Sequence, residues 1–295
     1  MSEPISVTTP SGITIRGSRA GSGPPVLLLH GFPQSHVMWR PVQEALAAHY
    51  TVVALDLRGY GRSDRPPAGE DHAGYSFRAM ATDPVEVMEA LGFPRFALVG
   101  HDRGARTAHR LALDHADRVE RLALLDIMPT DYVYGTVDRR VAEAYYHWFF
   151  FIQPFDVPER LIGADPVRYL HDLLGGWGSV QGAHSAESLA EYEAAFADPD
   201  ARHAMLEDYR AGASIDLRHD AESEQAGARI TAPTLVLWGE RGIVGRYAES
   251  PVDVWRTRAA DPGLVTGAAI PKAGHFLVEE NLQATLAALQ GFLTP

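Results

Sequence analysis

The chain has 295 residues, of which 46% are hydrophobic and 22% are charged, so it is long enough for one large domain or for a core domain with a lid. It contains no cysteine, which excludes disulfides, thiolate metal sites and a thiol nucleophile. The formal net charge of -12 disfavours nucleic acid as a partner, and it means that an anionic substrate would need local cations at its binding site.

No part of the sequence predicts a signal peptide or a membrane segment. Residues 1–5 carry no basic region and no long apolar stretch. No apolar run reaches the roughly 20 residues that a transmembrane helix requires. We therefore expect a cytoplasmic protein without a membrane partner.

Short apolar runs alternate with helical patterns in the first part of the chain. Residues 5–20 alternate loosely between polar and apolar side chains, which predicts a β-hairpin. Continuous apolar runs at 26–29, 51–55 and 96–99 are typical of strands that are buried on both faces of a parallel sheet. The apolar spacing over 79–91 predicts a helix.

The pattern changes in the middle of the chain. A buried-strand run occurs at 122–125, but none follows within 128–225, where the sequence is aromatic and helical. A strand run resumes at 234–239. A last strand is expected near 264–270, and a helix over 277–292.

Alternating strands and helices predict an α/β fold, with a mostly parallel sheet and helices on both faces. We expect residues 1–127 and 226–295 to form this core domain. Residues 128–225 are expected to form a helical cap, or lid, inserted between two strands of the sheet.

The segment 100–104, with the sequence GHDRG, follows a buried strand and precedes a helical pattern. This is the setting of the nucleophile elbow of the α/β-hydrolase fold, whose usual form is G-x-S-x-G, with glycines that permit a tight, strained turn. An aspartate, Asp102, stands where the serine usually does. Because a carboxylate in this position attacks carbon and forms an ester on the enzyme, the sequence predicts an aspartyl-ester hydrolase rather than a serine esterase.

The expected base is His275, which follows the last strand, as the chain order nucleophile–acid–histidine requires. It would deprotonate a water that attacks the ester. The acid usually follows the strand at 234–239, but Gly242 occupies that place. We therefore favour Asp126, at the end of the preceding strand, as the acid that orients the imidazole, with Glu240 as the alternative.

Backbone and side-chain donors are expected around the nucleophile. The N–H groups of Phe32, in the HGFP turn, and of Arg103 would form an oxyanion hole. Arg103 and Arg106 are three residues apart and share a helix face. Two guanidiniums match a substrate carboxylate, and they would also keep Asp102 ionised.

The aromatic lid supplies three side chains that combine a compact apolar body with an N–H or O–H donor, namely His147, Trp148 and Tyr209. Together they could hold a small leaving anion. The alternative is that they form only the packed apolar underside of the lid. The remaining histidines have no metal-ligand spacing, so we expect neither a metal nor a cofactor.

Seven motifs carry a resemblance to a known family: HGFPQSHVMW at 30–39, DLRGYGRSD at 56–64, GHDRGAR at 100–106, LLDIMPT at 124–130, YHWFFFIQP at 146–154, LWGERGIVG at 237–245 and GHF at 274–276. With these motifs the chain resembles the fluoroacetate (haloacetate) dehalogenases of the α/β-hydrolase superfamily along nearly its whole length. HDRGAR, YHWFF and the WGERG loop are the specific part of the match.

The resemblance implies a reaction. Asp102 would displace halide from the α-carbon of a small haloacid, and His275, held by Asp126, would activate the hydrolytic water. The resemblance further implies that Arg103 and Arg106 bind the substrate carboxylate, and that a homodimer forms.

The resemblance also favours a halide site in the lid, where the leaving halide would be held by His147, Trp148 and Tyr209. The preferred halogen depends on the volume of the pocket, which the sequence does not reveal.

Two other interpretations remain open. An epoxide hydrolase would use the same nucleophile and base, together with lid tyrosines such as Tyr145, Tyr146 or Tyr209 that protonate the epoxide oxygen. A neutral epoxide would, however, give the two arginines nothing to bind. A non-catalytic small-molecule binding protein of the same fold would have no need for an intact nucleophile, base and acid.

Overall fold

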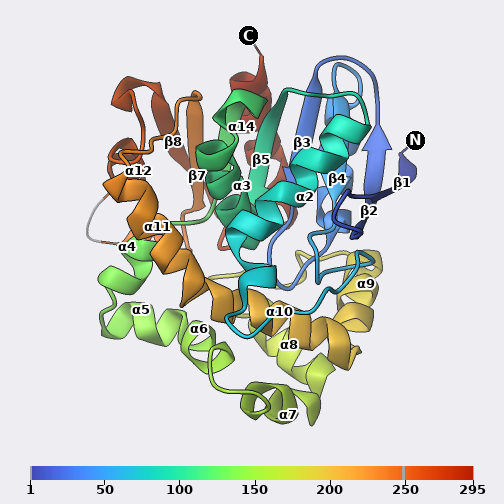
Figure 1. Ribbon diagram of the computed structural model, residues 1–295, viewed down its shortest axis with the longest axis vertical. Helices are drawn as coiled ribbons and strands as arrows, with labels where there is room; N and C mark the ends of the chain where they lie inside the picture. The colour runs from blue at the N-terminus through green and yellow to red at the C-terminus, as the bar shows by residue number, and fades with distance from the viewer. Residues whose placement is uncertain (1, 248–249, 295) are drawn as a thin grey trace.

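The computed structural model describes residues 2–247 and 250–294. Within this part of the chain, eight strands form one sheet in the order β1-β2-β4-β3-β5-β6-β7-β8. Helices cover both faces of the sheet, and a further group of helices lies across one end of it (Figure 1).

The sheet begins with an antiparallel hairpin. Strands β1 (Glu3–Thr8) and β2 (Thr14–Ala20) pair along their whole length, as the alternating pattern of this segment predicted. Strand β2 also runs antiparallel to β4 (Thr51–Leu55). The hairpin therefore extends one edge of an otherwise parallel sheet.

All remaining pairs are parallel, and they join β4 to β3 (Pro25–Leu29), β5 (Phe96–His101), β6 (Val119–Leu125), β7 (Thr234–Gly239) and β8 (Val265–Ile270). Strands β4 and β5 are buried at every residue, because helices cover both faces. The edge strand β8 is exposed at its four central residues. The predicted α/β-hydrolase fold is confirmed.

The core helices are α1 (Arg40–Leu46), α2 (Phe77–Ala90), α3 (Arg103–Asp114), α12 (Pro251–Arg256), α13 (Leu277–Glu280) and α14 (Leu282–Leu293). Short 3-10 helices lie at η1 (His36–Trp39), η2 (Ala73–Tyr75), η3 (Ala116–Arg118), η4 (Val244–Arg246) and η5 (Pro262–Leu264). Helices α2 and α3 pack together over one face of the sheet, and α1 and α14 pack together over the other.

The helix expected over 277–292 is in fact two helices, so that prediction was wrong in one detail. Asn281 separates α13 from α14 with φ −148° and ψ 72°, outside the helical region. Its side chain accepts a hydrogen bond from the backbone N–H of Ala284 and caps α14. Apolar periodicity continues across such a cap, and it therefore gives no sign of the break.

The segment between β6 and β7 contains helices only: α4 (Thr130–Gly135), α5 (Arg139–Ala144), α6 (Tyr146–Phe151), α7 (Val157–Gly163), α8 (Pro166–Leu174), α9 (Ala186–Ala197), α10 (Pro199–Gly212) and α11 (Ile215–Gln225). They gather at the end of the sheet where the parallel strands terminate (Figure 1). We refer to this group as the lid. Loops that leave the strands at this end therefore lie beneath it.

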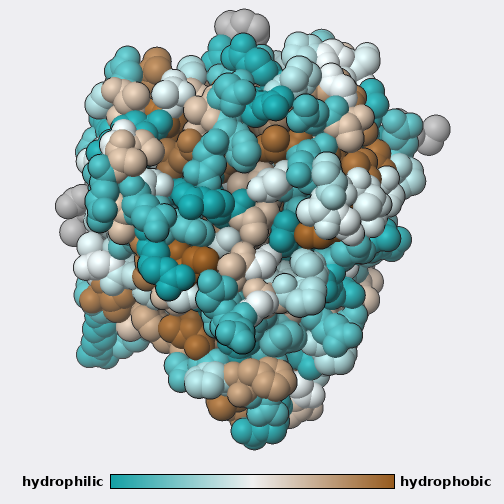
Figure 2. Space-filling model, viewed as in Figure 1, coloured by the Kyte–Doolittle hydropathy of each residue, from teal (hydrophilic) through white to brown (hydrophobic). Residues whose placement is uncertain are grey.

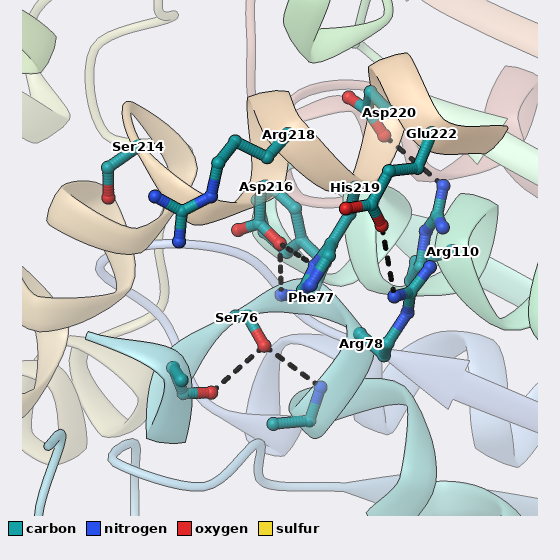
Figure 3. A network of polar contacts seen from close by, with 12 residues as sticks. Ser76, Phe77, Arg78, Arg110, Ser214, Asp216, Arg218, His219, Asp220 and Glu222 are labelled. Atoms are coloured by element: carbon teal, nitrogen blue, oxygen red, sulfur yellow. Dashed lines mark hydrogen bonds and ion pairs between the residues drawn. The ribbon is translucent and has the colours of Figure 1, made fainter. Parts of the chain in front are cut away.

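The last lid helix is fastened to the core by polar contacts (Figure 3). The carboxylate of Asp216 accepts a hydrogen bond from the backbone N–H of Phe77, 2.9 Å away, at the first residue of α2. Arg110 of α3 reaches Asp220 at 3.2 Å and the hydroxyl of Ser223 at 2.8 Å. Because α3 also follows the nucleophile elbow, these contacts set the lid relative to Asp102.

Hydrophilic residues spread over the visible face of both the core and the lid, interrupted by small apolar areas (Figure 2). The apolar side chains gather instead in one large core cluster that runs from the sheet into the lid. Among the helices described, none has the length and apolar character needed to cross a membrane.

Candidate active site

The nucleophile elbow lies between β5 and α3. Asp102 has φ 46° and ψ −116°, a conformation that is costly for a residue with a side chain. A Cβ atom at Gly100 would come within 2.5 Å of the carbonyl oxygen of Gly104, and one at Gly104 within 2.3 Å of that of His30. Glycine at both positions therefore permits the tight turn that presents Asp102 at the end of the sheet.

The carboxylate of Asp102 is buried and ionised. Its Oδ1 atom accepts a hydrogen bond from the backbone N–H of Phe32 at 2.9 Å. Burial raises the pKa of Asp102, but the charges of His275, His101, Arg106 and Arg103 outweigh burial and lower the pKa to about 2. The carboxylate is consequently available as a nucleophile at neutral pH.

Two backbone amides were predicted for an oxyanion hole. That of Phe32 already points at the nucleophile, as the hydrogen bond to Oδ1 of Asp102 shows. The amide of Arg103 is the first of α3, where the N–H groups of a helix have no partner within the helix itself.

A histidine–carboxylate pair lies beside the nucleophile. Nδ1 of His275 lies 2.7 Å from Oδ2 of Asp126, and the other oxygen of Asp126 accepts the backbone N–H of Gly239 at 2.9 Å. Burial lowers the pKa of His275, but the hydrogen bond and charge of Asp126, with the charge of Asp102, raise it on balance. With Nδ1–H donating to the carboxylate, Nε2 is left free to take a proton.

The two loops that could supply the acid converge on this pair. A Cβ atom at Gly242 would lie 3.5 Å from Oδ1 of Asp126, so the usual acid position borders the same carboxylate. Glu240, the alternative acid, is exposed and accepts the backbone N–H of Lys272 at 2.8 Å. The partner of His275 in the structure is therefore Asp126.

A small cavity lies between the elbow and the lid. It is lined by Phe32, Asp102, Tyr145, His147, Trp148, Trp177, Tyr209 and His275. Its volume of about 10 Å³ suffices for about one water molecule. Asp102, His275 and all three predicted lid donors thus line one small cavity.

The lid donors remain neutral. Burial lowers the pKa of His147 to about 3, so its imidazole is uncharged at neutral pH. Burial and the charge of Asp102 hold the pKa of Tyr209 well above its ordinary value, so its hydroxyl keeps its proton. Among the described residues, no hydrogen bond engages Nδ1 of His147, the indole N–H of Trp148 or the hydroxyl of Tyr209. Unpartnered polar groups in a buried cavity are costly unless a ligand engages them.

Two aromatic side chains complete the wall. The ring of Tyr145 stacks on Trp148 with centroids 5.2 Å apart. Trp177 contacts the rings of His147 at 4.7 Å and His275 at 5.3 Å. Sequence reasoning missed Trp177, and only its position in a glycine-rich loop could have drawn attention to it. Tyr146, considered above as a lid tyrosine, is 46% exposed and lies outside the cavity wall.

The two predicted carboxylate-binding arginines lie behind the wall. The guanidinium of Arg106 stacks 4.6 Å from the ring centre of Trp148, and that of Arg103 stacks 4.3 Å from Tyr209. Nη1 of Arg106 donates to the carbonyl oxygen of Met128 and to the hydroxyl of Thr130, whereas its Nε is buried without a hydrogen-bond partner among the described residues.

Arg103 is bound differently, in a way that the sequence did not reveal. Its Nε donates to Oδ2 of Asp208 at 2.9 Å, and its Nη2 donates to the carbonyl oxygen of the same residue at 2.7 Å. Arg103 is 1% exposed and Asp208 is fully buried. The structure therefore brings Arg103 close to the nucleophile, but with much of its hydrogen-bonding capacity already used.

No metal site accompanies these residues: among those described, no three or more histidine, aspartate or glutamate side chains cluster in a way that could hold an ion.

An elbow with a backbone amide on its nucleophile and a histidine–aspartate pair beside it define an enzyme of the α/β-hydrolase class. Residues 24–282 match the α/β hydrolase fold family, and the chain belongs to that family.

Three similar proteins represent its relatives. The chain is 47% identical to a fluoroacetate dehalogenase of Burkholderia sp., over 96% of this chain and 91% of that one. It is 35% identical to a soluble epoxide hydrolase of Corynebacterium sp., over 94% and 92% of the two chains. A solved α/β hydrolase structure from Nostoc sp. superposes with a TM-score of 0.95 at 52% identity, covering 99% of this chain and 98% of that one.

Proposed function

We propose that the protein is a hydrolytic dehalogenase of small 2-haloacids, which converts a haloacetate to glycolate and halide through an ester on Asp102. The observation that carries the proposal is the cavity, in which the ionised carboxylate of Asp102 faces neutral, unpartnered donors. A nucleophile that attacks carbon needs a place for the departing anion, and these donors provide one.

The first step is a displacement. Since Oδ1 of Asp102 accepts the amide of Phe32, Oδ2 is the free oxygen that attacks the α-carbon. The new C–O bond forms as the carbon–halogen bond breaks, and the negative charge passes from the carboxylate to the halide. His147, Trp148 and Tyr209 would solvate that halide with fixed N–H and O–H groups, in place of part of its shell of water.

The second step is hydrolysis of the ester. Nε2 of His275 takes a proton from water, and the resulting hydroxide attacks Cγ of Asp102. Charge then develops on Oδ1, where the amide of Phe32 is already in place, and the amide of Arg103 would add a second donor. Collapse of this intermediate breaks the bond between Cγ and Oδ2, and the imidazolium of His275 returns its proton to Oδ2, which leaves as the hydroxyl oxygen of glycolate. The new carboxyl group of Asp102 then loses its proton to solvent, because its pKa is about 2. Asp126 stabilises the imidazolium that forms.

The arginines favour a substrate that carries a carboxylate. Arg106 is buried, lies against Trp148 and has no hydrogen-bond partner at Nε among the described residues. A guanidinium edge of this kind binds a carboxylate through charge-assisted hydrogen bonds. Arg103 would contribute from the other side, behind Tyr209.

Epoxide hydrolysis is the second candidate, because Tyr145 and Tyr209 both line the cavity and could protonate an epoxide oxygen. One of the relatives reported above, a soluble epoxide hydrolase, also supports this second candidate. An uncharged epoxide would, however, leave the buried charge of Arg106 without a ligand.

The two activities separate in one assay. Purified protein is incubated with fluoroacetate, chloroacetate and styrene oxide, and both halide and diol are measured. We expect halide release and little diol. Diol formation without halide release would reject the dehalogenase and favour the epoxide hydrolase.

A further inference from the structure

A buried ion pair joins the residue after the nucleophile to the residue before a proposed halide donor. Arg103 follows Asp102 in the elbow, and Asp208 precedes Tyr209 on lid helix α10. Besides the bonds already given, Nη2 of Arg103 donates to Oδ1 of Asp208, so the side chains meet as a fork. The hydroxyl of Tyr60 donates to Oδ2 of the same carboxylate at 2.7 Å.

This pair decides which part of Arg103 is left for a ligand. Asp208 engages Nε and Nη2, and among the described residues no hydrogen bond engages Nη1. Arg106 shows the opposite arrangement, with Nη1 engaged and Nε unpartnered. The two arginines therefore offer different donors: one terminal nitrogen from Arg103, and the Nε side of Arg106.

The pair also restrains where the Arg103 charge lies. Its guanidinium is held between the rings of Phe77 and Tyr209, 4.6 and 4.3 Å from their centres. Without a carboxylate to hold it, a guanidinium this close to Asp102 would be drawn to the nucleophile. A nucleophile paired with Arg103 would be less free to attack carbon, and the substrate carboxylate would lose a ligand.

We propose that Asp208 is a positioning residue, which holds Arg103 so that one end of its guanidinium serves the substrate carboxylate while the nucleophile stays unpaired. This inference rests on the proposed function, because it concerns the carboxylate-binding part of the same site. Tyr60 supports it by donating to Oδ2 of Asp208, the oxygen that also accepts Nε of Arg103.

The test compares Asp208→Asn with a matched variant, Asp83→Asn. Asp83 forms a similar buried fork with Arg58, through bonds of 2.6 Å to Nε and Nη2, but it does not line the cavity. Calorimetry measures the binding of acetate, the probe for the carboxylate site, and of acetamide, its neutral counterpart. Circular dichroism and thermal melting report whether each variant is folded.

In Asp208→Asn we expect acetate binding to weaken by about tenfold or more, the scale of one lost charge-assisted bond, and acetamide binding to change little. With chloroacetate the loss should fall mainly on KM rather than on kcat. Asp83→Asn should leave the preference for acetate over acetamide as it is in the wild type. Tyr60→Phe should shift the preference in the same direction as Asp208→Asn, by about threefold.

Unchanged or tighter acetate binding by folded Asp208→Asn would overturn the proposal, since Asp208 would then act on acetate only by repelling its charge. An equal loss of acetate binding in Asp83→Asn would also overturn it, because the loss would then reflect general destabilisation of the protein. If Asp208→Asn does not fold, Tyr60→Phe decides by the same criterion. Failure of the proposed function shows up separately, as a wild-type protein that binds acetate but releases no halide from any haloacetate.

Discussion

Asp126 and Gly242 share one place in the site, although they come from different loops. Nδ1 of His275 lies 2.7 Å from Oδ2 of Asp126. A Cβ atom at Gly242 would lie 3.5 Å from Oδ1 of the same carboxylate. Both positions can thus serve the same imidazole. A glycine at 242 leaves room for the carboxylate that the preceding strand supplies.

Two substitutions test the acid, one that removes the carboxylate at Asp126 and one that places a carboxylate at Gly242. We expect Asp126→Asn to reduce kcat by on the order of 10²-fold or more, because an uncharged partner no longer stabilises the imidazolium. Glu240→Gln should be nearly silent, since this exposed side chain only accepts the amide of Lys272. Adding Gly242→Asp to Asp126→Asn should restore part of the activity. The measurement is steady-state halide release, and a crippled Glu240→Gln would contradict the assignment.

Removal of the base should separate the two chemical steps. His275→Ala is expected to release about one halide per site and then stop, because alkylation of Asp102 precedes the step that needs the base. Mass spectrometry should find the adduct on the peptide that contains Asp102. Continued turnover by this variant would show that another group activates the water.

The pH dependence should also differ between the steps. The pKa of Asp102 is lowered to about 2, so this carboxylate stays ionised until the pH falls close to that value. The pKa of His275 is raised above 6.5, so its proton-accepting form is lost as the pH falls through that higher value. We expect kcat for hydrolysis to decline below neutral pH, while the halide burst of the wild-type protein, which reports alkylation of Asp102, persists into acid. A burst that declines over the same range as kcat would assign the neutral titration to the nucleophile.

Arg106→Lys tests the carboxylate site. An ammonium cannot present the Nε side of a guanidinium, and lost charge-assisted bonds cost roughly 1.5–3 kcal/mol each, so KM for chloroacetate should rise by about tenfold or more. The control is Arg58→Lys, which alters a buried fork to Asp83 but no contact at the cavity or between the lid and the core. Unchanged kinetics in Arg106→Lys would remove this arginine from the site.

The lid donors should matter most for fluoride, whose charge is the most concentrated of the halides. Trp148→Phe removes an N–H and Tyr209→Phe removes a hydroxyl, and each should lower kcat/KM for fluoroacetate by on the order of 10²-fold, as for oxyanion-hole donors. Bromoacetate should be affected much less. Trp39→Phe is the control, because it deletes a buried, unpartnered indole N–H outside the cavity. A constant fluoroacetate-to-bromoacetate ratio in both lid variants would mean that these rings are only packing.

The positions of the strands along the chain and of the elbow were accessible from the sequence, because both depend on local pattern. A strand buried on both faces must be apolar throughout, and a turn as tight as that around Asp102 needs glycine on either side. Asn281 was not accessible in the same way, since its role as a helix cap leaves apolar periodicity unbroken. The elbow alone was sufficient to indicate a carboxylate nucleophile.

Only the tertiary structure decided which side chains meet across the cavity. Trp177 reaches His275 from a lid loop, and Asp208 reaches Arg103 from a lid helix 105 residues further along the chain. Neither contact leaves a periodic trace in the sequence, because an ion pair between distant elements depends on how the lid docks on the core. The sequence therefore determined that a carboxylate stands at the elbow, whereas the docking of the lid determined which donors of Arg103 and Arg106 have no hydrogen-bond partner among the described residues.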